Sequence, residues 1–130
     1  MNTKSLRQSV TIKAKPSQVY EVLMDSKLHA RLTSSKVKIT NKVGDKFTAG
    51  DGYIEGENIA LKKDKKIIQA WRASDWPKDH FSKATFSLAS VKGGTKLTFY
   101  QSGIPEANFD GIKKGWIDYY WQPMKKMLEK

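Results

Sequence analysis

The two histidines, His29 and His80, are the side chains best suited to acid–base chemistry near neutral pH. His80 follows Asp79, and a histidine beside a carboxylate has the residue types of a general base and the group that orients it. Neighbouring residues of an extended chain point to opposite sides, so this pair is not expected to act together. We expect His80 to make a structural hydrogen bond that closes a loop. The sequence around His29 offers no set of ligands.

Other sequence motifs of catalytic or phosphate-binding sites are absent or incomplete. The chain has no cysteine, and it contains neither a Gly-x-Ser-x-Gly nor a Ser-x-x-Lys nucleophile motif. The segment GDGYIEG at 50–56 lacks the lysine spacing and the following helix of a phosphate loop, so a tight turn and a bulge explain its glycines better. Glu55 and Glu57 share a strand face and are expected to face solvent. The sequence therefore predicts no catalytic residue, no metal site and no cofactor, and thus no enzyme.

The charge is strongly basic, with 24 Lys and Arg against 13 Asp and Glu and a net charge of +11. Such a balance favours acidic partners. The lysines are dispersed along the chain, which is more typical of a solvated surface than of a binding site. A sheet that binds RNA needs exposed aromatic side chains, whereas Phe86 and Phe99 lie in alternating apolar rows that indicate a core. Nucleic acid is therefore not the partner that we expect.

Apolar and polar residues alternate at 6–14, which predicts the first strand. Pro16 predicts the start of a helix at 16–25, and a second short helix is expected at 27–33. The pattern then changes to short strands, expected at 36–41, 46–49, 53–61, 65–72, 82–88 and 95–101. Poor alternation predicts a bulge within 53–61, and Gly93-Gly94 predicts a hairpin between the last two strands.

The last stretch, 109–130, is predicted to form one long helix with an unusually wide apolar face. The residues on this face are Phe109, Ile112, Trp116, Ile117, Tyr119, Tyr120, Trp121, Pro123, Met124, Met127 and Leu128. Asn108 is expected to cap the helix, and Pro123 is expected to kink it. The face covers roughly twice the ~100° of an ordinary surface helix, so a sheet must wrap around it. The sequence predicts an α+β helix-grip fold, with a curved antiparallel sheet of about six to seven strands, in a single domain at 1–130.

Four segments occur in a specific order and spacing: GDGYIEGENIAL at 50–61, KKIIQAWRASDWPKDHFS at 65–82, GIPEANF at 103–109 and GWIDYYWQPMKKML at 115–128. They resemble the START-like helix-grip superfamily and, within it, the C-terminal domain family of the activator of heat-shock protein 90 ATPase. The resemblance covers almost the whole chain and implies the helix-grip fold. In the full-length co-chaperone a separate N-terminal domain supplies the main grip on the chaperone, whereas here residues 1–14 lead directly into the first strand. We therefore expect the fold to carry over, and the co-chaperone activity not to follow from the resemblance.

Two functions are expected. The first is a non-enzymatic binding domain, similar to the chaperone ATPase activators and stress-related, that contacts a heat-shock protein 90 type chaperone weakly. The residues expected at that contact are Trp76, Pro77, His80, Lys62, Lys63, Lys65 and Lys66. The second is a carrier or sensor of a small hydrophobic ligand in a cavity between helix and sheet, with a filled core as the alternative. The residues expected to line that cavity are Tyr20, Trp71, Phe86, Phe99, Trp116 and Tyr120.

Two features of the sequence predict the cellular compartment. The absence of cysteine excludes disulfides and gives no sign of an oxidising environment. The polar, alternating N-terminus has no apolar segment typical of a signal peptide, and no run approaches the ~20 apolar residues of a membrane span. We expect a soluble, cytoplasmic protein.

Overall fold

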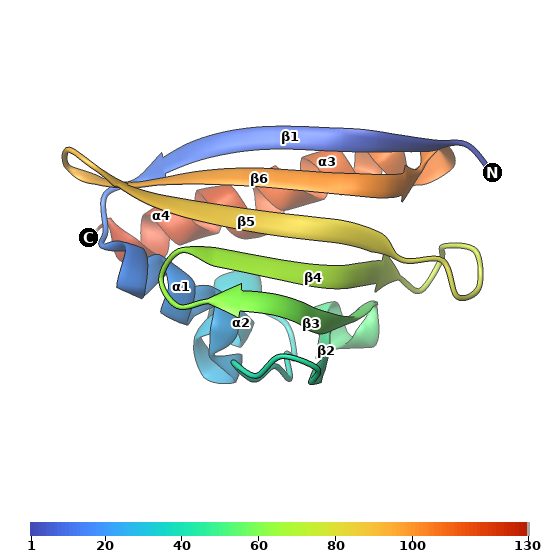
Figure 1. The fold of residues 1–130 in the computed structure, drawn as a ribbon, viewed down its shortest axis with the longest axis horizontal. Helices are drawn as coiled ribbons and strands as arrows, with labels where there is room; N and C mark the ends of the chain where they lie inside the picture. Colours follow the sequence, from blue (N-terminus) through green and yellow to red (C-terminus); the bar gives the residue numbers. More distant parts are fainter. Residues whose placement is uncertain (130) are drawn as a thin grey trace.

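A computed structural model describes residues 1–129 as a curved antiparallel sheet that wraps around a C-terminal helix (Figure 1). The strands are β1 (Thr3–Ile12), β2 (Lys46–Ala49), β3 (Ile54–Lys62), β4 (Lys66–Ala73), β5 (Ser82–Val91) and β6 (Gly94–Pro105). Their spatial order is β1-β6-β5-β4-β3-β2, so β2 to β6 form a meander and β1 pairs with β6 at the far edge. The predicted α+β helix-grip fold is confirmed.

The strands follow from alternation. In β4, Ile67, Gln69 and Trp71 are buried while the residues between them are more exposed, which is the pattern of a sheet with one covered face. The predicted bulge is confirmed by a shift of the β3–β4 register between Asn58 and Ala60. The predicted hairpin is confirmed as well, because Val91 pairs with Gly94 at the turn between β5 and β6.

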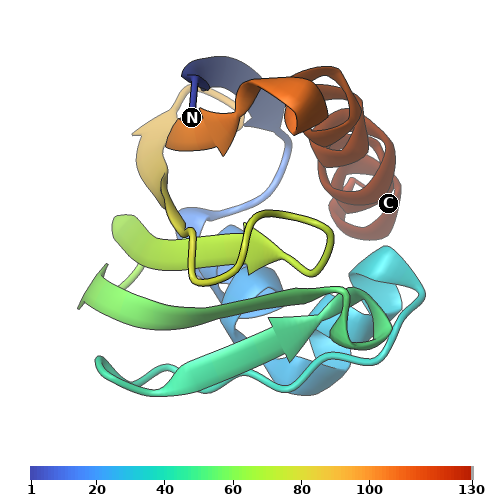
Figure 2. The ribbon, with the colours of Figure 1, turned by 90° about the vertical axis from the view of Figure 1, so that its right-hand side faces the viewer.

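The helices all lie on the inner side of the sheet (Figure 2). The two short ones are α1 (Pro16–Met24) and α2 (Ser26–Thr33), both as expected. The long one consists of α3 (Phe109–Trp116), η3 (Ile117–Trp121) and α4 (Gln122–Leu128). Four aromatic residues fill the space between it and the sheet, since Trp116 stacks on Trp121 at 5.6 Å and lies 4.3 Å from Phe99, which in turn lies 5.0 Å from Phe86. No helix within residues 1–129 is long and apolar enough to cross a membrane.

The C-terminal helix is irregular next to Pro123, where a kink is expected, whereas the side-chain cap expected at Asn108 is absent. Asn108 makes no capping hydrogen bond with its side chain, so the predicted cap is wrong. Before Pro123 the helix widens into the π turn η3, in which the Gln122 amide donates to the Ile117 carbonyl. Proline offers no N–H to the preceding turn, and this change of register accommodates its absence. The apolar face is also buried only in part, because Tyr119 is 61% exposed and Ile117 36% exposed.

The strand expected at 36–41 is not formed. Only Lys38 pairs there, through an isolated bridge to Thr48. The neighbouring backbone is held by side chains instead: Asn58 Nδ2 donates to the carbonyls of Thr40 and Lys42, at 2.7 and 3.1 Å. Buried Asn58 thus replaces a β-ladder, which a pattern of apolar and polar residues does not reveal.

Candidate functional site

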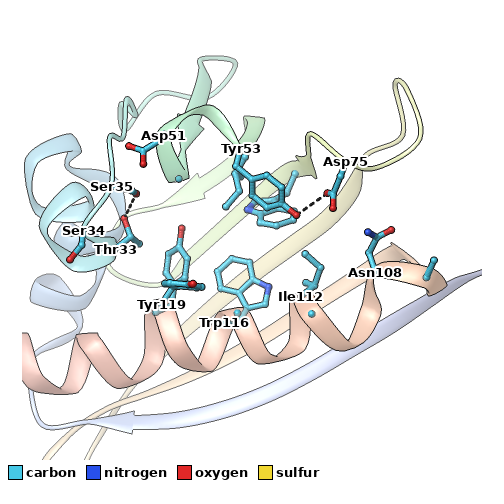
Figure 3. Close-up of a pocket in the computed structure, with 17 residues that line it drawn as sticks. Thr33, Ser34, Ser35, Asp51, Tyr53, Asp75, Asn108, Ile112, Trp116 and Tyr119 are labelled. Carbon is cyan, nitrogen blue, oxygen red and sulfur yellow. Dashed lines mark hydrogen bonds between the residues drawn. The ribbon is translucent and has the colours of Figure 1, made fainter.

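A cavity of about 660 Å³ opens between the N-terminal part of the C-terminal helix and the loops that follow α2 and β2 (Figure 3). On the helix side its lining residues are Ala107, Asn108, Gly111, Ile112, Gly115, Trp116, Tyr119 and Tyr120. On the opposite side they are Thr33, Ser34, Ser35, Gly50, Asp51, Tyr53, Ile54, Trp71 and Asp75. We call this cavity the helix pocket. Its volume lies within the ~300–1,000 Å³ of typical sites for small molecules.

Two glycines keep the helix side of the pocket open. Gly111 and Gly115 are four residues apart in the chain and therefore lie on one face of the helix. A Cβ added to Gly111 would meet nothing within 4 Å, and one added to Gly115 would meet only the Tyr119 ring at 3.9 Å. Glycine in a helix costs roughly 0.5–1 kcal/mol relative to alanine, and here no close packing demands it. The helix thus presents bare backbone to the pocket.

The rim of the pocket is acidic. The Tyr53 hydroxyl donates a 2.8 Å hydrogen bond to Asp75 Oδ1 (Figure 3). The Lys36 amide donates a 2.7 Å hydrogen bond to Asp51 Oδ1. Burial, together with the hydrogen bond and the negative charge of Asp75, raises the pKa of Tyr53 to about 12, so its hydroxyl stays protonated. None of the lining residues is a lysine, arginine or histidine, although the chain carries a net charge of +11.

The structure brings together only half of the predicted cavity residues. Trp71, Trp116 and Tyr120 line the helix pocket. Phe86 and Phe99 do not, since both are buried in the aromatic cluster, where rings fill the space between helix and sheet. Their assignment to a cavity was therefore wrong. Tyr20 lies apart, beside a separate surface hollow together with Lys63 and Asp64.

The predicted partner residues fall into two places. Lys62, Lys63, Lys65 and Lys66 are exposed around the turn between β3 and β4, and Asp64 at its tip has a left-handed backbone, with φ 63°. The others belong to the 74–81 loop between β4 and β5, where Pro77 is exposed. Trp76, in contrast, is 4% exposed, so its side chain is a core residue rather than a surface contact.

His80 has the structural role expected of it. Its Nε2 lies 2.7 Å from the Gly103 carbonyl oxygen, which joins the 74–81 loop to β6. Arg72 holds the other side of the loop by donating to the Trp76 carbonyl at 3.1 Å. Within residues 1–129 no group of three or more histidine, cysteine, aspartate or glutamate side chains is placed to hold a metal ion.

His29 is the residue that sequence reasoning missed. It is buried, with Nδ1 2.9 Å from the Leu23 carbonyl oxygen and Nε2 2.8 Å from the Tyr120 hydroxyl. A carbonyl only accepts, so Nδ1 carries the proton and Tyr120 donates to Nε2. Burial lowers the pKa of His29, partly opposed by the hydrogen bond to Leu23. Tyr120 lies 91 residues away in the chain, so no local signal predicts the pair.

Comparison with known proteins supports one family throughout the chain. Residues 13–129 match the family model described as activator of Hsp90 ATPase homolog 1-like protein. The human activator of 90 kDa heat shock protein ATPase homolog 1 is 29% identical over 116 residues, which are 89% of this chain and 34% of that protein. The Saccharomyces cerevisiae Hsp90 co-chaperone AHA1 is 26% identical over 132 residues, 95% of this chain and 37% of the co-chaperone. The chain thus spans about a third of the length of the curated relatives it matches.

Solved structures share the fold. An HSP90 activator from Plasmodium falciparum superposes with a TM-score of 0.88 at 26% identity, over 95% of this chain and 94% of that one. The Aha1 dimer from Colwellia psychrerythraea gives a TM-score of 0.84 at 18% identity, over 97% of this chain and 96% of that one.

Proposed function

Because the chain belongs to the family of activator of Hsp90 ATPase homolog 1-like proteins, we propose that it is a non-enzymatic domain that binds an Hsp90-type chaperone. The observation that carries this proposal is the match to the Plasmodium falciparum HSP90 activator, which extends over 94% of that chain. The proposal agrees with the site chemistry, because the histidines of residues 1–129 are held in structural hydrogen bonds.

The lysines of the β3–β4 turn are the proposed contact. Lys62, Lys63, Lys65 and Lys66 are exposed, and the one ion pair found within residues 1–129 joins Arg72 to Glu55 at 3.1 Å, away from the turn. Their charges are therefore available to an acidic surface. Exposed charges at the rim of an interface raise the association rate more than the final affinity. Binding should accordingly be micromolar or weaker, and it should decrease as salt is added.

A pair of matched charge reversals tests this contact. Changing Lys62, Lys63, Lys65 and Lys66 to glutamate replaces four positive charges by four negative ones and lowers the net charge from +11 to +3. Changing four other exposed lysines, Lys36, Lys38, Lys42 and Lys46, has the same effect on net charge. Both variants are titrated into an Hsp90-type chaperone at low and high salt, while binding and ATP turnover are followed. Loss of binding in the first variant alone supports the turn as the contact.

Other outcomes have distinct meanings. Equal loss in the two variants would show that only net charge matters and would remove the turn from the proposal. Tight binding that is independent of salt would contradict the electrostatic contact. An absence of binding by the unmodified chain at every salt concentration would overturn the chaperone proposal itself.

The helix pocket favours a second candidate function, the binding of a small molecule with a large apolar surface. An apolar fluorescent probe should bind with one-to-one stoichiometry and raise the melting temperature. The variant Gly111→Leu provides the control, because Gly111 lines the pocket and a Cβ there would meet nothing within 4 Å, so a larger side chain should reduce the space for a ligand. Binding that survives this substitution would place the probe elsewhere.

A further inference from the structure

We infer that the helix pocket selects a small organic cation with a flat aromatic body over neutral or anionic molecules of the same shape. The inference rests on the second candidate function and names the chemical class of its ligand. Its grounds are the aromatic walls of the pocket, the carboxylates on its rim and one indole N–H in its lining.

Several aromatic rings line the helix pocket. Trp71 and Trp116 lie 5.5 Å apart between ring centres, and Trp116 lies 4.5 Å from Tyr120. Two further rings stand at the mouth, where Tyr53 is 42% exposed and Tyr119 is 61% exposed. The faces of such rings attract cations within about 6 Å, and an apolar aromatic body packs well among them.

The rim adds negative charge that the protein leaves unpaired. Asp75 and Asp51 each accept one hydrogen bond through Oδ1, from the Tyr53 hydroxyl and the Lys36 amide. Neither takes part in an ion pair within residues 1–129. An anionic ligand would meet these carboxylates without any basic side chain in the lining, whereas an ammonium group would be attracted to both.

Trp71 gives the ligand a second anchor. The residue is 4% exposed and lines the pocket. Trp116 and Trp121 donate their indole N–H groups to Gln101 and Gln8, but that of Trp71 has no such partner within residues 1–129. This N–H is not among the buried polar atoms without a partner, so it is accessible and can donate to a ligand that carries an acceptor beside its aromatic body.

The net positive charge of the protein opposes the binding of a cation. A net charge of +11 repels cations at long range, so a preference for a cation must arise from contacts inside the pocket. At roughly 0.3 M salt the screening length falls to about 5–6 Å, which weakens the long-range repulsion while close contacts persist. The preference should therefore be retained in high salt.

Three probes with one aromatic body test the inference: 1-naphthylmethylammonium, neutral 1-naphthylmethanol and the anion 1-naphthoate. Their affinities are measured by isothermal titration calorimetry at neutral pH and roughly 0.3 M salt. We expect the cation to bind at least about tenfold more tightly than the anion, with the neutral probe between them. The double variant Asp51→Asn, Asp75→Asn should reduce the difference between cation and neutral probe, and Gly111→Leu should weaken all three.

Each result decides between the inference and the function on which it rests. If the neutral or anionic probe binds as tightly as the cation, the pocket remains a ligand site but the preference for cations is overturned. If the cation loses no affinity in the aspartate variant, the rim carboxylates are not its partners. If no probe binds, both the small-molecule function and the inference fail. The comparison of the three probes uses the unmodified chain, so it remains decisive even if a variant fails to fold.

Discussion

The Tyr120 hydroxyl donates a 2.8 Å hydrogen bond to Nε2 of His29 and thereby joins α2 to the π turn of the C-terminal helix. The two rings meet edge to face, 5.3 Å apart between centres, and both residues are buried. The other ring nitrogen donates to the Leu23 carbonyl, so the imidazole is fully hydrogen-bonded in its neutral form. Burial raises the pKa of Tyr120 and lowers that of His29, and both shifts favour neutral rings.

This pair predicts a loss of stability in mild acid. The pKa of His29 is lowered from its ordinary value of 6.5, so below about pH 6.5 the unfolded chain binds a proton that the folded protein resists. The contribution of neutral His29 is therefore complete above pH 6.5 and decreases as the pH falls toward the lowered pKa. Urea unfolding between about pH 7.5 and 5 measures it. The variant His29→Gln should lack this component, and an identical pH dependence in both proteins would contradict the assignment.

Removing the donor of the pair gives a second prediction. Tyr120→Phe leaves Nε2 of His29 buried without a partner, which should lower the free energy of unfolding by roughly 1–3 kcal/mol. Tyr119→Phe is a matched control, because its neighbour Tyr119 is 61% exposed and the same loss of a hydroxyl should have little effect. Equal effects in chemical denaturation would show that the hydrogen bond to His29 contributes nothing.

Trp116 is expected to be the most costly aromatic residue to truncate. It is 3% exposed, stacks on Trp121 and donates to buried Gln101 at 2.8 Å. Trp116→Ala should lower the free energy of unfolding by roughly 3–5 kcal/mol. Trp116→Phe keeps most of the ring but leaves Gln101 without its donor, so the cost of this variant measures the hydrogen bond more directly. An unchanged unfolding midpoint in the alanine variant would show that the sheet does not grip the helix.

Two glycine substitutions should have opposite effects. A Cβ at Gly56 would clash with the Ala70 carbonyl oxygen and lie 2.6 Å from the Phe47 ring, so Gly56→Ala forces the backbone apart and should cost about 1–3 kcal/mol or more. Gly111→Ala meets open space in a helix and should be neutral or stabilising by up to about 1 kcal/mol. Thermal and urea unfolding of both variants checks the contrast. A destabilised Gly111→Ala variant would show that the pocket is narrower than described.

Sequence patterns predicted the structure correctly where the residues of a single element are enough to determine it. Alternation located most of the strands, and poor alternation located the bulge between Asn58 and Ala60. The pattern failed where long-range partners replace local ones. Asn58 holds the 40–42 backbone through its side chain, so the expected strand is absent. Trp76 is one of the residues expected at the partner contact, yet it is buried and its ring lies 5.4 Å from that of Trp71.

The sequence by itself determined the fold class, because a helix with so wide an apolar face can be buried only by a sheet that curves around it. Only the tertiary structure decided where that burial is incomplete. Phe86 and Phe99 fill one end of the space between helix and sheet, while Gly111 and Gly115 leave the helix pocket at the other. Periodicity indicates which side of an element faces inward. The distance between packed elements, and pairs such as His29 and Tyr120, depend on side chains that meet only after the chain has folded.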